Sequence, residues 1–87
     1  MTDGVELRPD EYVYVQIADA FAERIEHGEL TPGARLPSEM KLAEEYGVAR
    51  LTARRAVREL VTRGLVKTLP GKGTFVIERQ DVHNRDA

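Results

Sequence analysis

Three stretches with helical periodicity divide the chain, and each ends at a glycine. In the first stretch apolar side chains recur every four residues, which places them along one stripe of an amphipathic helix. Glycine readily adopts the left-handed conformation that ends many helices, so its position predicts where each helix stops. The predicted helices cover about residues 11–27, 39–46 and 50–63, and the glycines that follow them are Gly28, Gly47 and Gly64. Only a very short turn therefore separates the last two helices.

The second predicted helix has clear start signals. Ser38 stands at its N-cap position, where a side-chain oxygen can accept a hydrogen bond from a free backbone N–H. Glu39 follows with a negative charge that suits the positive end of the helix dipole. Residues 30–37, which contain two prolines and a glycine, form the preceding loop, and we expect Leu36 to turn toward the core.

The third predicted helix has two distinct faces. At 100° per residue, Ala53, Ala56, Val57 and Leu60 cluster on one side, whereas Arg50, Arg54 and Arg58 line up on another. Two short helices joined by a glycine-containing turn, the second of them basic on its outer face, form the helix-turn-helix pattern. In DNA-binding proteins of this pattern the second helix enters the major groove.

Two short segments after the third helix are rich in β-branched and aromatic residues and predict a β-hairpin. The segments are Leu65 to Leu69 and Thr74 to Glu78, joined by Pro70-Gly71-Lys72-Gly73, which gives the hairpin a basic tip. The predicted fold is mainly α with a small β-hairpin, a winged helix-turn-helix of three helices plus the wing. We expect residues 1–10 to be a flexible leader, 11–78 the domain, and 79–87 a polar tail or the start of a linker.

Charge is distributed unevenly along the 87 residues. From Gly47 to Gly73 there are seven basic residues and one acid, a local charge of +6, while the whole chain carries −2, so the other sixty residues sum to −8. A basic surface on an otherwise acidic molecule suits a polyanionic partner. A solvated basic helix face without a partner is the simpler alternative, and charge alone leaves it open.

No signature of an enzyme or a metal site is present. The chain has no cysteine, and neither His27 nor His83 has a second ligand at a suitable spacing. A single short domain also has little room for a concave catalytic pocket. The apolar runs are far shorter than the ~20 residues of a membrane span, and no signal-peptide pattern opens the chain. We therefore predict a cytoplasmic binding protein without catalytic residues, cofactor, metal or membrane contact.

Arginine suits DNA recognition because its planar fork donates two hydrogen bonds to one guanine or one phosphate. Arg50 and Arg54 are the expected base or phosphate contacts at the start of the third helix, and Thr52 offers a hydroxyl group there. Leu51 either contacts a thymine methyl group or is an ordinary exposed leucine, and both interpretations stay open. Lys72 is either a phosphate contact or a common hairpin residue.

Taken in order, these segments resemble the DNA-binding domain of GntR-type bacterial transcriptional regulators over roughly residues 12–77. The matching motifs are Tyr14-Val15-Gln16-Ile17-Ala18, residues 28–39 (GELTPGARLPSE), Leu42-Ala43, Gly47-Val48-Ala49-Arg50, residues 52–57 (TARRAV), Leu60, Gly64-Leu65-Val66 and residues 71–76 (GKGTFV). The resemblance implies a winged helix whose third helix reads the major groove and whose hairpin tip lies at the minor groove. It also implies sequence-specific binding of double-stranded DNA for transcriptional regulation, usually repression.

Two residues depart from the family's pattern. Ala49 stands where the family usually has Ser or Thr, so the third helix lacks a side-chain cap worth ~1 kcal/mol. Leu51 changes the surface that faces the bases. With these departures included, the expected DNA-contacting residues are Arg35, Ser38, Glu39, Ala49, Arg50, Leu51, Thr52, Arg54, Arg55, Arg58, Gly71, Lys72 and Gly73.

Members of this family usually continue into a ligand-binding and dimerising domain. The chain is then either the N-terminal domain of a longer regulator or a small stand-alone protein, and both interpretations stay open. For a longer parent chain the resemblance implies a homodimer on a pseudo-palindromic operator and a small-molecule effector, while this domain alone binds one half-site. A winged helix that serves as a protein–protein interaction module, with its arginine face against an acidic partner, is the alternative hypothesis from a different class.

Overall fold

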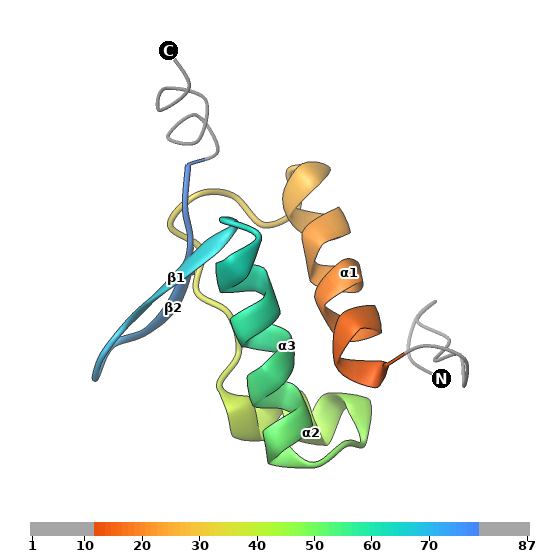
Figure 1. The fold of residues 1–87 in the computed structure, drawn as a ribbon. Helices are drawn as coiled ribbons and strands as arrows, with labels where there is room; N and C mark the ends of the chain where they lie inside the picture. The colour runs from red at the N-terminus through yellow and green to blue at the C-terminus, as the bar shows by residue number, and fades with distance from the viewer. Residues whose placement is uncertain (1–11, 79–87) are drawn as a thin grey trace.

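A computed structural model describes residues 12–78, which fold into three helices followed by a two-stranded antiparallel hairpin (Figure 1). The elements are α1 (Val13–Glu26), α2 (Glu39–Tyr46), α3 (Arg50–Thr62), β1 (Val66–Leu69) and β2 (Gly73–Val76). The expected winged helix-turn-helix is confirmed. The leader expected at 1–10 and the tail expected at 79–87 lie outside the described residues.

The predicted helix bounds are closer to the structure than the predicted strand bounds. Helix α2 has the predicted bounds, and α3 ends one residue early because Arg63 is its C-cap. Helix α1 covers 13–26 instead of 11–27 because Tyr12 is extended and serves as its N-cap. The strands cover 66–69 and 73–76 instead of 65–69 and 74–78. Leu69 pairs with Gly73 in the hairpin register, so the connecting turn consists only of residues 70–72.

One hydrophobic core lies between the three helices and the base of the hairpin. Helix α1 packs against α3, and fully buried alanines on both helices, Ala18, Ala53 and Ala56, allow the helices to approach closely. The buried apolar residues are Ile17, Ala18, Phe21, Ile25, Leu36, Leu42, Ala43, Ala53, Ala56, Leu60, Leu65, Val66 and Val76. The inward position predicted for Leu36 is confirmed.

Local interactions fix both ends of α2. The Ser38 side chain accepts a hydrogen bond from the Lys41 backbone N–H at 3.2 Å, which confirms the predicted N-cap. At the other end Gly47 is left-handed, with φ 65° and ψ 39°. The Val48 N–H donates to the Ala43 carbonyl at 3.0 Å. The chain thus changes direction within the three residues that separate α2 from α3.

Part of the loop before α2 pairs with the hairpin, which the sequence analysis did not predict. The backbone bonds run from Gly33 N–H to the Val76 carbonyl (2.8 Å), from Val76 N–H to the Ala34 carbonyl (2.9 Å) and from Leu36 N–H to the Thr74 carbonyl (2.8 Å). Arg35 forms an isolated antiparallel bridge with Phe75. Residues 33–36 thus cover one edge of β2 and fix the hairpin relative to the start of α2.

Arg63 fastens the end of α3 to α1. Its Nη2 lies 2.7 Å from Asp19 Oδ1, and its Nε donates to Glu59 Oε2 at 2.9 Å. One guanidinium therefore joins a carboxylate of α1 to a carboxylate of α3.

Leu60 is 1% exposed in the core, whereas its neighbour Val61 is 41% exposed. We expect Leu60→Ala to lower the free energy of unfolding by about 2–5 kcal/mol, because it removes buried methyl groups and leaves a cavity. The matched variant Val61→Ala should change it by about 0.5 kcal/mol or less. Urea unfolding followed by circular dichroism measures both changes, and equal losses would contradict the placement of Leu60 in the core.

Candidate nucleic-acid interface

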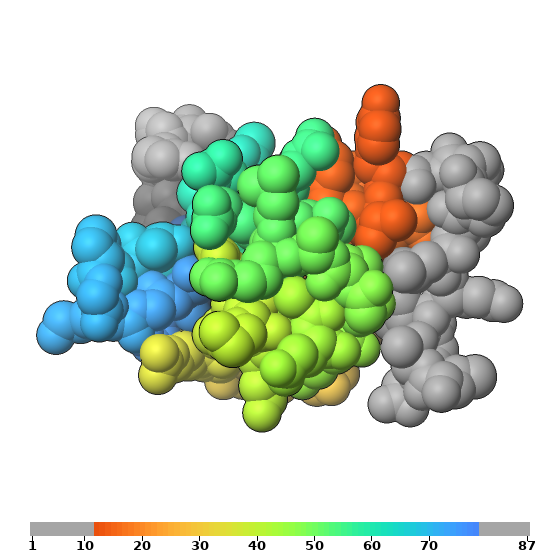
Figure 2. Space-filling model, turned by 90° about the horizontal axis from the view of Figure 1, so that it is seen from below, coloured from red at the N-terminus to blue at the C-terminus, as the bar shows by residue number. Residues whose placement is uncertain are grey.

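The first turns of α2 and α3 lie at the same end of the molecule. Figure 2 views this end directly: α2 and α3 occupy the middle of the face, the hairpin stands on one side, and α1 lies on the other. The structure thus brings together the first turns of α2 and α3, where several of the residues expected at DNA lie, and places the hairpin next to α3.

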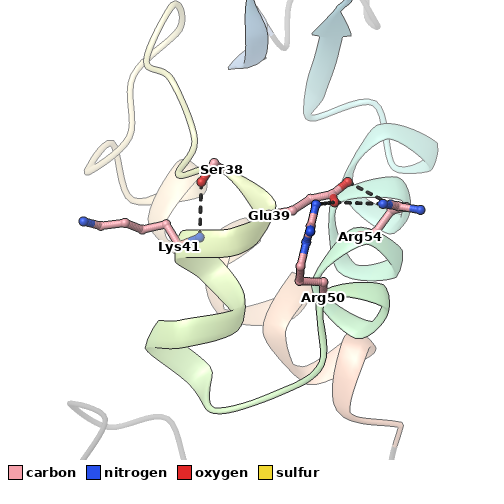
Figure 3. Close-up of polar contacts among 5 residues, drawn as sticks. All are labelled: Ser38, Glu39, Lys41, Arg50 and Arg54. Carbon is pink, nitrogen blue, oxygen red and sulfur yellow. Dashed lines mark hydrogen bonds and ion pairs between the residues drawn. The ribbon is translucent and has the colours of Figure 1, made fainter.

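Glu39 joins the first turn of α2 to α3 through two arginines (Figure 3). Arg54 donates to both carboxylate oxygens, with Nε 2.9 Å from Oε2 and Nη2 3.1 Å from Oε1. Arg50 Nη2 lies 3.8 Å from Oε1 of the same residue. The hydrogen bonds from Arg54 hold the pKa of the Glu39 carboxyl below its ordinary value, although slight burial acts in the opposite direction.

This ion pair gives Glu39 a role that the sequence analysis missed. Glu39 and Arg54 are 15 residues apart, and only the packing of α2 on α3 brings them together. An arginine side chain has five N–H donors, of which Glu39 engages two on Arg54. The guanidinium is therefore held in one orientation and retains donors for a further acceptor.

The N-termini of α2 and α3 differ in their caps and in their exposed side chains. Ala49, the N-cap of α3, provides no side-chain hydrogen bond, in contrast to Ser38. Leu51 is 60% exposed in the first turn of α3, and Thr52 beside it is half-buried. Met40 is 54% exposed in the first turn of α2 and adds a second apolar side chain that the sequence analysis did not single out.

An open groove of about 990 Å³ runs between α3 and the hairpin. Its basic lining consists of Arg35, Arg54, Arg58 and Lys67. Lys67 was not among the expected contact residues, because a single lysine within a predicted strand is not distinctive. Basic side chains from the loop before α2, from α3 and from β1 therefore face one groove.

Gly73 allows Arg35 to lie close to the hairpin. A Cβ atom at position 73 would stand 2.7 Å from Arg35 Nε, and the glycine has φ 130°. At the tip, Gly71 and Lys72 are exposed, and Gly71 has φ 77°. The tip thus presents a lysine between two glycines, as expected, and its contact with DNA stays a prediction.

Arg55 lies apart from the Glu39 cluster. Its guanidinium carbon lies 4.3 Å from the ring centroid of Tyr14, which belongs to the first turn of α1. Arg58 is exposed between the two sites and borders both the groove beside the hairpin and a smaller hollow near Tyr14. The expected contact residues on α3 are therefore divided between two sides of the helix.

Residues 12–78 contain neither a cluster of metal ligands nor a helix that could cross a membrane. In that part of the chain no three His, Asp or Glu side chains are grouped so that they could hold a metal ion. No helix there has both the length and the apolar character needed to cross a membrane.

A helix-turn-helix with exposed arginines, followed by a basic hairpin, defines the winged-helix class of DNA-binding domain. The model of the family described as bacterial regulatory proteins, gntR family, matches residues 13–76. The chain belongs to this family, and the resemblance inferred from its motifs is confirmed.

Two relatives are longer proteins, and this chain matches only part of each. It is 46% identical over 68 residues to the mannosyl-D-glycerate transport/metabolism system repressor MngR of Escherichia coli (strain K12), with 78% of this chain and 28% of that protein covered. It is 45% identical over 64 residues to the HTH-type transcriptional repressor NagR of Bacillus subtilis (strain 168), with 74% and 26% covered. The chain thus spans about a quarter of the length of these relatives.

Solved structures with the same fold include YtrA from Sulfolobus acidocaldarius, a GntR-family transcription factor. It superimposes with a TM-score of 0.80 at 30% identity, covering 99% of this chain and 97% of that one. The AraR DNA-binding domain in complex with operator ORE1 superimposes with a TM-score of 0.69 at 36% identity, covering 72% and 77%. This chain is thus a winged-helix DNA-binding domain of the kind found in GntR-family transcriptional regulators.

The lowered pKa of Glu39 makes its contribution to stability depend on pH. The ion pair with Arg54 stabilises the fold above the pKa of an unfolded glutamate, roughly 4.3, and this stabilisation is lost as the pH falls through the lower folded-state value. We expect Glu39→Gln to be less stable than the wild type at neutral pH, with the difference vanishing in strong acid.

Urea unfolding at several pH values measures this difference. Glu45→Gln, which changes an exposed residue of the same helix, is the control and should show a smaller difference at neutral pH. A loss of stability in Glu39→Gln that stays constant down to strong acid would show that the carboxylate charge is not responsible.

Proposed function

We propose that this domain recognises a specific sequence of double-stranded DNA and represses transcription from the operators that it occupies. The observation that carries the proposal is the arrangement of Arg50 and Arg54 around Glu39 where α2 and α3 meet. A guanidinium that is already oriented loses less conformational freedom on binding. Its remaining donors match a guanine edge or a phosphate group.

In the proposed complex α3 enters the major groove and the hairpin tip lies at the minor groove. Arg50 and Arg54 face base edges or nearby phosphates, and Leu51 is free to meet a thymine methyl group. The basic groove between α3 and the hairpin suits the sugar–phosphate backbone that passes between them. The full contact set that we propose is Arg35, Ser38, Glu39, Ala49, Arg50, Leu51, Thr52, Arg54, Arg55, Arg58, Gly71, Lys72 and Gly73.

The names of two relatives support repression. MngR and NagR are named as repressors, and the AraR domain was solved on an operator. The chain spans about a quarter of those two repressors, so dimerisation and effector binding enter the proposal only for a longer parent chain that carries a ligand domain. Such a parent would place two of these domains on the half-sites of a pseudo-palindrome. The proposed role is non-enzymatic and is carried out in the cytoplasm, where bacterial DNA lies.

Selection from a random duplex pool at low salt tests the proposal, and enrichment of a short half-site is the expected result. Arg54→Ala should then bind the selected half-site roughly tenfold or more weakly, because a bidentate contact to a guanine is lost. Arg24→Ala is the matched control: its side chain is 41% exposed and paired with Glu29, whereas that of Arg54 is 43% exposed and paired with Glu39.

Other results of the selection and of the affinity measurements would contradict the proposal or part of it. Retention of DNA without any enriched sequence would contradict specific recognition. No retention by a folded sample would favour the alternative class, a protein-interaction module whose arginine face meets an acidic partner. Equal affinities of Arg54→Ala and Arg24→Ala would show that Arg54 does not read the half-site.

Lys72 at the hairpin tip should contribute charge without sequence preference. We expect Lys72→Ala to weaken binding about equally for all sequences and to reduce the slope of log affinity against log salt by about one. Lys72→Arg keeps the charge and should keep the slope. Fluorescence anisotropy over a salt series measures both, and a loss confined to one base pair would contradict a contact with phosphate alone.

A further inference from the structure

We propose that Tyr14 and Arg55 form a second phosphate-binding site, which contacts the DNA backbone on the side of α3 opposite the hairpin. This inference rests on the proposed DNA-binding function: it gives Arg55, already in the proposed contact set, a contact with phosphate, and it extends the interface to Tyr14 on α1. The ring of Tyr14 and the guanidinium of Arg55, 4.3 Å apart, join the first turn of α1 to α3.

Arg55 differs from three other arginines of residues 12–78, which each form an ion pair with a carboxylate. Arg24, Arg54 and Arg63 each lie within 3.2 Å of a carboxylate oxygen, on Glu29, Glu39 and Asp19 respectively. Within residues 12–78 no carboxylate forms an ion pair with Arg55 or with Arg58. A cation without an internal partner gains more from an external phosphate, because no ion pair has to be broken first.

The contact with Tyr14 orients Arg55 without using its hydrogen-bond donors. A cation–π contact joins the guanidinium to the face of the ring and needs no hydrogen-bond acceptor, and no hydrogen bond joins Arg55 to an acceptor within residues 12–78. The side chain is thus held in place while its donors remain available. This is the arrangement that a backbone contact requires, since a phosphate accepts two parallel hydrogen bonds from one arginine.

The surroundings of the pair suit an anion. A shallow hollow of about 200 Å³ is lined by Tyr14, Arg55, Arg58, Glu59 and Thr62. The carboxylate of Glu59 accepts a hydrogen bond from Arg63 at 2.9 Å, so its charge is balanced within the protein. Two arginines that have no ion-pair partner within the described residues, and two hydroxyl groups, remain to face a phosphate.

The position of the pair assigns this phosphate to the wall of the major groove that lies on the far side of α3 from the hairpin. Helix α1 and the hairpin flank α3 on opposite sides in both views (Figures 1 and 2). A helix in the major groove lies between two sugar–phosphate backbones, about 12 Å apart. With the hairpin beside one backbone, the start of α1 and Arg55 are placed beside the other.

Salt dependence on the selected half-site, extended by several base pairs on both sides, is the first test. One phosphate contact adds about 0.9 to the magnitude of the slope of log affinity against log salt. With the two affinities equal at 1 M salt, where the ionic contribution vanishes, Arg55→Ala should bind about eightfold more weakly at 0.1 M salt. Arg24→Ala is the control, because Arg24 also lies over an aromatic ring, Phe21 at 5.1 Å, but is paired with Glu29. It should keep the wild-type slope.

Variants of Tyr14 test whether this residue positions Arg55. Tyr14→Leu removes the ring and should reduce the slope as Arg55→Ala does, whereas Tyr14→Phe should restore the slope. The double variant Tyr14→Leu/Arg55→Ala should lose no more than Arg55→Ala alone. Thermal unfolding shows that each variant is folded before its affinity is compared. Additive losses would overturn the positioning role of Tyr14.

Replacing single phosphates by neutral methylphosphonates locates the contact. The wild type should lose affinity at one flanking phosphate, and Arg55→Ala should be insensitive to the same replacement. If wild-type protein binds the half-site and Arg55→Ala responds to every replacement as the wild type does, the second phosphate site is wrong while DNA binding stands. If wild-type protein binds no duplex, the proposed function itself fails.

Discussion

Helix α3 must bury one side and expose another, and this constraint places every other element of the domain. Ala53, Ala56 and Leu60 are almost completely buried, and they form the surface on which α1, α2 and the start of the hairpin assemble. The small size of the two alanines lets neighbouring helices lie close to the α3 backbone. Because the helix is rotated so that these residues face inward, its arginines are necessarily directed outward. Packing therefore decides where the charge lies.

Within residues 12–78 some arginines form ion pairs with carboxylates and others do not. Arg63 joins Asp19 and Glu59, which holds the end of α3 against α1, and Arg54 joins Glu39 across the helix-turn-helix. These pairs are partly exposed and add modestly to stability, but they orient the guanidinium groups. The arginines that no carboxylate of residues 12–78 pairs, Arg55 and Arg58 among them, leave a positive field on a chain whose net charge is negative. The acidic residues thus determine which arginines are already paired within the protein, and they also offset part of the positive charge.

Interactions local in sequence were predictable, and those made by tertiary packing were not. The periodicity of three helices, the Ser38 cap and the left-handed turn at Gly47 each depend on a few neighbouring residues, and the structure has all of them. The pairing of residues 33–36 with β2 escaped prediction because Gly33 and two prolines interrupt any strand alternation there. The contacts between Glu39 and Arg54 and between Tyr14 and Arg55 join distant residues, so no short motif indicates them.

The hairpin is connected to the start of α2 by one short segment, residues 33–36, which pairs with β2 and leads into the helix. Arg35 pairs through its backbone with Phe75, and its side chain lies where a Cβ at Gly73 would stand. Ser38 follows three residues later and caps α2. The backbone hydrogen bonds of residues 33–36 with β2 thus connect the hairpin to the loop that leads directly into α2. The position of the hairpin beside the first turn of α2, and so the arrangement of the proposed interface, depends on backbone pairing as well as on the packing of side chains.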